Sequence, residues 1–172
     1  MSYRNFILIF LAFISCHHKI HDYSLGDDIH NYQSGMGITM SYYSHSNIEF
    51  QLVASKVKHF HVPHEETVFS NGVEVLVYNK KLDTIATILA DSVIQKKNQD
   101  MVEIRKNVIL RNIKNEQLHT ENLFWDIKEG RVYTEDFVTI NTQKEIIMGY
   151  GFVTNQKFSN YSIYNITGTI YL

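Results

Sequence analysis

The feature that most constrains the fold of this chain is a short motif that recurs about every fifteen residues in its second half. The motif is an Asp, Asn or Gly followed mostly by apolar residues, and its five copies begin at Asp91, Asn107, Asn122, Asp136 and Gly151. These residue types tolerate left-handed or bulged backbone. A bulge at the same point of successive strands would bend them together and curl their sheet. The repeat therefore predicts a curled β-jelly roll or β-sandwich made of two facing sheets.

The composition and the local patterns also indicate strands. Ile, Val, Thr, Tyr, Phe and Trp account for 66 of the 172 residues, against four alanines, and such side chains fit a pleated, half-buried surface. From about Gly35 onward apolar residues alternate with polar ones, as at Ile48, Phe50 and Leu52, which is typical of antiparallel strands with one buried face. Residues 82–95 taken alone show helical spacing, but the repeat runs through them and predicts a strand there too.

The first sixteen residues have the pattern of a targeting signal. Residues 1–5 are polar with one Arg, residues 6–14 are an unbroken apolar run, and the only cysteine, Cys16, follows Ser15. Nine apolar residues are too few to cross a hydrocarbon core of about 30 Å as a helix, but they match the apolar core of a secretory signal peptide. A cysteine at this place is where a bacterial lipoprotein signal is cut and the new terminus acylated.

We therefore expect three segments along the chain. Residues 1–15 are a lipoprotein signal peptide, residues 16–34 are a lipidated N-terminus and polar tether with Cys16 as the lipidation site, and residues 35–172 are the β-jelly-roll domain. Several acyl chains on one cysteine would hold the protein at the membrane, because each buried methylene contributes about 0.8 kcal/mol. An ordinary signal peptide with an incidental cysteine is the alternative.

Charge and motifs argue against several function classes. The net charge of −2 gives no electrostatic footprint for nucleic acid. A lone cysteine excludes internal disulfides and cysteine-based zinc patterns, and the sequence has no Gly-rich phosphate loop and no G-x-S-x-G motif. We expect no catalytic residue, no enzyme activity and no cofactor.

One histidine cluster leaves an alternative open. His59, His61 and His64 form an H-x-H-x-x-H pattern beside Glu65 and Glu66. Alternation along a strand would place His59 and His61 on one face, as a zinc site requires. A polar strand end before a proline accounts for the same residues without a metal, so we expect no metal site.

Several runs in the order in which they occur resemble the LptC family, and in particular its Bacteroidetes-type branch. They are FSNGVEVLVY (69–78), ATILA (86–90), LHTENLFWD (118–126), GRVYTEDFVTI (130–140), IMGYGF (147–152) and FSNYSI (158–163). The resemblance covers roughly residues 35–165. It implies an OstA-like antiparallel jelly roll with an open apolar groove.

The resemblance also implies a role and partners. The protein would be a periplasm-facing component of the lipopolysaccharide export machinery, anchored to the inner membrane. It would receive lipopolysaccharide from the permease subunits of an inner-membrane ABC transporter and pass it to a periplasmic bridge protein of the same fold. Many members of the family hold the membrane with a transmembrane helix, in place of which this chain would use a lipid on Cys16. The alternatives are a ligand-free structural or adhesin-type surface lipoprotein and a metal-dependent hydrolase at the histidine cluster.

Acyl chains need a continuous apolar trough, and alternation along the strands selects the residues that face it. The candidate lipid-binding residues are Val75, Val77, Ile88, Ile104, Val108, Leu110, Leu118, Leu123, Trp125, Val132, Val138, Ile140 and Phe152. The same residues would form an ordinary core in any sandwich.

The last fifteen residues, 158–172, carry no charge. An exposed edge strand normally carries Lys or Pro that prevents pairing, so this segment is either a buried strand or a docking edge for a partner strand. Under the second interpretation, the docking edge contains Tyr161, Ile163, Ile166 and Ile170. Upstream, Gly149 is a glycine inside a predicted strand, which indicates a bulge or a close backbone approach.

Overall fold

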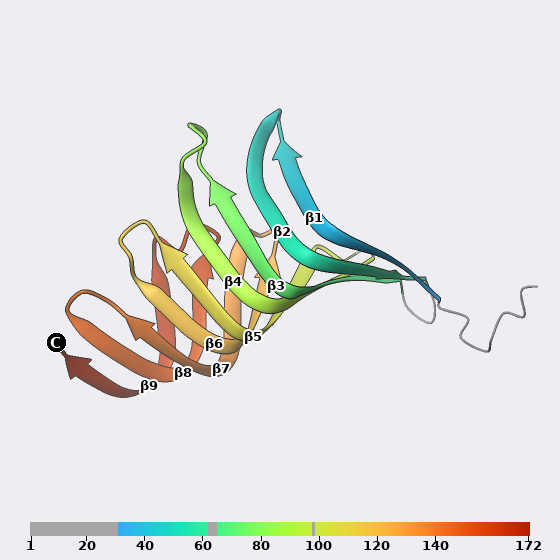
Figure 1. Ribbon diagram of the computed structural model, residues 1–172. Helices are drawn as coiled ribbons and strands as arrows, with labels where there is room; N and C mark the ends of the chain where they lie inside the picture. Colours follow the sequence, from blue (N-terminus) through green and yellow to red (C-terminus); the bar gives the residue numbers. More distant parts are fainter. Residues whose placement is uncertain (1–30, 62–64, 98) are drawn as a thin grey trace, which may run out of the picture. The chain divides into compact units, whose positions relative to one another are not determined.

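The computed structural model describes residues 31–61, 65–97 and 99–172. The predicted signal peptide, Cys16 and the tether as far as residue 30 lie outside the described residues. The strands are β1 (Tyr32–Ser44), β2 (Asn47–Phe60), β3 (Glu66–Tyr78), β4 (Thr84–Lys96), β5 (Met101–Asn112), β6 (Gln117–Asp126), β7 (Arg131–Asn141), β8 (Glu145–Asn155) and β9 (Tyr161–Tyr171). They pair antiparallel in chain order, β1 to β9, in one open sheet (Figure 1). The predicted all-β fold is therefore confirmed, and β1 begins three residues before the expected domain start at Gly35.

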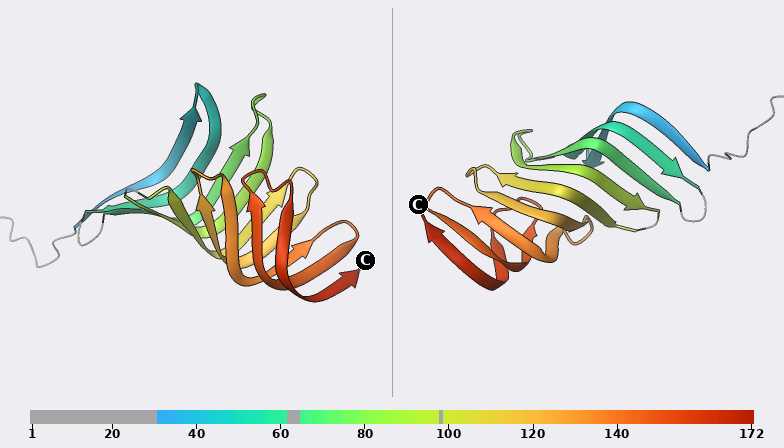
Figure 2. Two further views of the ribbon diagram at one scale, coloured as in Figure 1. Left: turned by 180° about the vertical axis from the view of Figure 1, so that it is seen from behind. Right: turned by 60° about the horizontal axis from the view of Figure 1, so that its bottom comes forward.

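The sheet is curled because its strands bend near their middles. Figures 1 and 2 show the strands bent, with their two halves facing each other most clearly in β6 to β9, so that one sheet supplies both layers of the jelly roll, where we expected two sheets. The register of neighbouring strands shifts at the bends, for example between Leu89 and Ser92 in β4 and between Arg105 and Val108 in β5. Each of these shifts leaves residues without a partner in the ladder, which is the mark of a β-bulge.

The repeated motif lies at these bends. Asp91, Asn107, Asn122 and Asp136 all fall within register shifts, and the φ angles of Asn107 and Gly151 are 51° and 75°. The side chains add a second link between strands. Asn107 Nδ2 donates to Asp91 Oδ2 at 2.8 Å, and Asn122 Nδ2 donates to Asp136 Oδ2 at 2.7 Å. The repeat therefore bends the backbone as predicted, and its side chains add hydrogen bonds between neighbouring bends, which we do not predict from the sequence.

Residues 84–96 form strand β4, so the repeat and not the helical spacing predicts this segment correctly. The bulge explains the misleading pattern. Ala86, Ile88 and Ala90 are buried at every second position, and beyond the bulge the next buried residue is Val93. Inserting one residue into the alternation of a strand locally produces a spacing of three, which resembles that of a helix.

The core lies between the two facing halves of the sheet. It is a single cluster of buried apolar side chains that extends from Phe50 in β2 to Phe152 in β8 and Phe158 in the following turn. Three of the described turns between strands contain an asparagine whose side chain accepts backbone hydrogen bonds: Asn79, Asn112 and Asn155. For example, Asn79 Oδ1 accepts hydrogen bonds from the backbone N–H groups of Lys81 and Asp83 at 2.8 and 3.0 Å, the local pairing for which asparagine is favoured in turns. In the described part of the chain, a search for a helix able to cross a membrane finds none.

Candidate lipid-binding groove and docking edges

All thirteen candidate lipid-binding residues lie on the inner face of the curled sheet and are buried, with exposed fractions of 3% or less. They divide into two groups. Val75, Ile104 and Trp125 line an apolar pocket of about 210 Å³ between the two halves of the sheet. The other ten belong to the surrounding packed core.

The pocket occupies the half of the interior that β1 to β6 enclose. Its walls are apolar, and its polar lining includes Gln95, Gln99 and Asp100 at and after the end of β4. Our residue selection omits Phe50 and Leu52 in β2, which also line it. Their alternation with Glu49 and Gln51 is the sequence pattern that would have identified them as inward-facing. Met40 in β1 lines the pocket too, but β1 lacks a regular alternation that would single it out.

Trp125 has an unusual environment in this pocket. Its ring packs at an angle of 60° against Phe50, with 4.9 Å between the ring centroids. Its Nε1 is the one buried side-chain polar atom without a hydrogen-bond partner among the described residues. A buried donor that lacks a partner costs about 1–3 kcal/mol. The pocket therefore offers apolar walls together with one N–H group that an acceptor on a ligand could satisfy.

The other half of the interior is closed. Phe152, Phe158 and Tyr161 form an aromatic cluster with ring centroids 5.4–5.9 Å apart. Asn112 Nδ2 donates to the carbonyl oxygen of Phe158 at 3.0 Å, which joins the end of β5 to the turn between β8 and β9. Burial, reinforced by the charges of Glu116 and Glu145, raises the pKa of Tyr161 above its usual range. Side chains therefore fill the β8–β9 end of the interior, and the hydrogen bond from Asn112 holds that end closed.

The predicted docking edge is an edge of the sheet. Strand β9 pairs only with β8 among the described strands. Tyr161 and Ile163 are partly buried and pack against the core, whereas Ile166 and Ile170 are 61% and 52% exposed.

The structure adds a second edge that we do not predict from the sequence. Strand β1 lies at the opposite end of the sheet (Figure 1), and like β9 it contains no Lys, Arg, Asp, Glu or Pro. Met36 and Tyr43 on β1 are 83% and 62% exposed. The absence of charge in residues 32–44 is the sequence pattern that would have identified this edge, but we place residues 32–34 in the tether and so do not recognise the segment as one uncharged strand. Both ends of the sheet therefore lack the residues that usually prevent strand addition.

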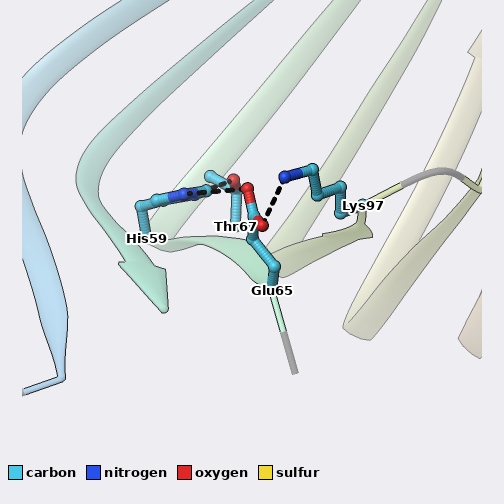
Figure 3. Close-up of polar contacts among 4 residues, drawn as sticks. All are labelled: His59, Glu65, Thr67 and Lys97. Atoms are coloured by element: carbon cyan, nitrogen blue, oxygen red, sulfur yellow. Dashed lines mark hydrogen bonds and ion pairs between the residues drawn. The ribbon is translucent and has the colours of Figure 1, made fainter. Parts of the chain in front are cut away.

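The structure brings together part of the predicted histidine cluster, and Figure 3 shows His59 beside Glu65 with Thr67 and Lys97 next to them. His59 Nδ1 lies 2.9 Å from Thr67 Oγ1, and His59 Nε2 lies 3.7 Å from Glu65 Oε1. Lys97 Nζ donates to Glu65 Oε2 at 2.5 Å. This hydrogen bond holds the pKa of the Glu65 carboxyl below its usual range, although partial desolvation opposes the effect. Pro63 and His64 lie outside the described residues.

Comparison with known proteins gives a family. The model of the family described as "Lipopolysaccharide-assembly, LptC-related" matches residues 7–171, nearly the whole chain. No curated protein matches the chain. The family match agrees with the curled antiparallel sheet and its apolar interior. The chain therefore belongs to the LptC-related family of lipopolysaccharide-assembly proteins, a periplasmic, inner-membrane-associated transport family and not a family of enzymes.

Proposed function

We propose that this protein receives lipopolysaccharide from an inner-membrane ABC transporter and passes it to a periplasmic bridge protein of the same fold. The observation that carries the proposal is an apolar pocket inside a sheet with two uncharged, unpaired edges within the described residues. A carrier needs the pocket to shield acyl chains, and it needs the edges to join its neighbours.

The pocket supplies the driving force for holding a lipid. Burial of apolar surface contributes about 25 cal/mol per Å², so shielding 200 Å² of acyl chain would contribute about 5 kcal/mol. The pocket volume of about 210 Å³ is below the roughly 300–1,000 Å³ of typical ligand sites. The two halves of the sheet must therefore part to admit a lipid with several chains. The two layers can part more easily in the half of the interior that β1 to β6 enclose. In the other half of the interior, the aromatic cluster and the hydrogen bond from Asn112 to Phe158 keep the layers together.

The two edges of the sheet, β1 and β9, supply the surfaces on which partner proteins can dock. An extended strand of a partner can add to an open sheet edge through main-chain hydrogen bonds. We assign β9, with Ile166 and Ile170 exposed, to the bridge protein. The opposite edge, β1, is then left for the transporter, so that the three interiors would lie in series.

A lipid on Cys16 would anchor the chain in the manner of the Bacteroidetes-type branch. The replacement Cys16→Ala should move the protein from the membrane fraction to the soluble fraction, because the anchor is lost while the jelly roll is unchanged. Retention of this variant in the membrane pellet would contradict the anchor.

In-cell photo-crosslinking tests the transport role. A photoreactive residue at Ile104, inside the pocket, should form adducts with lipopolysaccharide. The same residue at Leu89, an exposed apolar side chain on β4, should form none and serves as the matched control. Absence of lipid adducts at Ile104 in transporting cells would count against the proposal and in favour of a ligand-free structural lipoprotein.

A further inference from the structure

We propose that His59, His61 and Glu65 bind a divalent cation of the zinc class where β2 ends and β3 begins. One ligand atom from each side chain lies within 4.8 Å of the other two. The site goes beyond lipopolysaccharide transport and does not depend on it. It replaces our expectation from the sequence that the chain has no metal site, because the fold brings Glu65 next to the two histidines.

The fold brings the three ligands together for a simple reason. His59 and His61 are two residues apart at the end of β2 and so project from the same side of the chain, with their rings edge to face at 4.6 Å between centroids. The antiparallel pairing of β2 with β3 places Thr67 opposite His59, which puts Glu65 just beyond it. Four ligands at about 2.0–2.2 Å from zinc are roughly 3.4 Å apart in a tetrahedron, and His59 Nε2 and Glu65 Oε1 are already 3.7 Å apart.

The neighbouring side chains orient these ligands. Thr67 Oγ1 occupies the Nδ1 side of His59, which leaves Nε2 directed toward Glu65. Lys97 Nζ holds Oε2 of Glu65, which leaves Oε1 as the ligating oxygen (Figure 3). Such partners on the second nitrogen and the second oxygen are the usual outer contacts of metal ligands. The Lys97 side chain is 56% exposed, so water and salt screen its repulsion of a cation.

The ligand types select the metal. Two imidazoles and one carboxylate suit Zn²⁺, Co²⁺, Ni²⁺ or Cu²⁺, whereas Ca²⁺ and Mg²⁺ prefer oxygen ligands alone. Three protein ligands leave a fourth position for water or another oxygen donor. The depression beside His59 and Glu65 shares Gln95, Gln99 and Asp100 with the apolar pocket. A bound metal would therefore tie β2 to β3 at the edge of that pocket.

Titration of the metal-stripped full chain with Co²⁺ and Zn²⁺ tests the site. Other histidines occur in the chain, so the readout is the difference between variants. The wild type should bind one more equivalent of Co²⁺, with the absorption of a tetrahedral complex, than His61→Ala or Glu65→Gln. The variant His119→Ala, with its substitution on β6 outside the cluster, should keep that equivalent. Thr67→Val should weaken binding about 10- to 100-fold.

A second measurement separates metal binding from folding. His61 is exposed, so His61→Ala should melt at the same temperature as the metal-free wild type. Zn²⁺ should slow amide hydrogen exchange at residues 65–67 in the wild type and not in His61→Ala. Equal Co²⁺ binding by the wild type and His61→Ala, or a wild type without a tetrahedral Co²⁺ spectrum, would overturn the proposal.

Discussion

A methyl group added at Gly149 in β8 would lie 2.5 Å from the carbonyl oxygen of Asn165 and 2.8 Å from Cγ2 of Ile163. Both neighbours belong to β9, and one of them is backbone, so β9 itself must shift to admit the methyl group. Overpacking of this kind costs about 1–3 kcal/mol. Alanine also removes the conformational freedom of glycine in the unfolded chain, which returns about 0.5–1 kcal/mol. We expect Gly149→Ala to lower the free energy of unfolding by about 1–2 kcal/mol.

The strand pair offers a matched control. A methyl group at Gly168 in β9 would meet only Cε of Met148, at 3.1 Å, and that atom ends a flexible side chain. Gly168→Ala should therefore change stability by less than about 0.5 kcal/mol.

Urea denaturation and hydrogen exchange measure the difference. With a slope of about 2 kcal/mol/M, the urea midpoint of Gly149→Ala should fall by roughly 0.5–1 M and that of Gly168→Ala should not. Amides of β9 should also exchange faster in Gly149→Ala. Equal midpoints for the two variants would refute the close approach of β8 and β9 at this position.

Three further predictions concern the bend, the edge and the closed end. Asn107→Ala should destabilise the protein by about 1–2 kcal/mol, because alanine tolerates a φ of 51° poorly. Asn107→Gly, which loses only the hydrogen bond to Asp91, should destabilise it less in the same urea assay, and a larger loss of stability in Asn107→Gly than in Asn107→Ala would contradict the argument. Ile166→Lys should abolish cross-linking to the bridge protein, because an exposed lysine on an edge opposes strand pairing, while circular dichroism melting stays unchanged; unaltered cross-linking would remove β9 as the docking edge. Because the pKa of Tyr161 is raised above 10.0 in the folded state, the unfolded chain loses this proton first, and the free energy of unfolding should fall as the pH rises past 10.0. The urea midpoint of Tyr161→Phe should fall less over this pH range than that of the wild type, and an equal fall would be evidence against the effect.

Much of the fold can be predicted from the sequence, because the bulge motif carries two signals at once. Asp91 and Asn107 mark the bend because their residue types tolerate bulged backbone, and the recurrence of the motif predicts that successive strands bend together. The same motif resolves the helical spacing of residues 82–95 correctly. The start of β1 is harder to predict, because residues 32–34 are polar and lie in an edge strand that buries little.

The site is less predictable than the fold. Alternation identifies buried residues such as Val75 and Leu118 correctly, but it cannot separate those beside an open pocket from those in a filled core. That distinction depends on contacts between strands that are distant in sequence. Phe158, for example, closes one end of the interior from a turn, where no strand pattern marks it.

Trp125 allows the most direct test of lipid binding, because it is the only tryptophan in the chain and it lines the pocket. Its intrinsic fluorescence therefore reports on this site alone. Titration of the purified full chain with lipopolysaccharide should change the Trp125 emission in a saturable manner, and Ile104→Asp should abolish the change. Lipopolysaccharide that binds with the Trp125 emission unaltered would show that the pocket is not where the acyl chains lie.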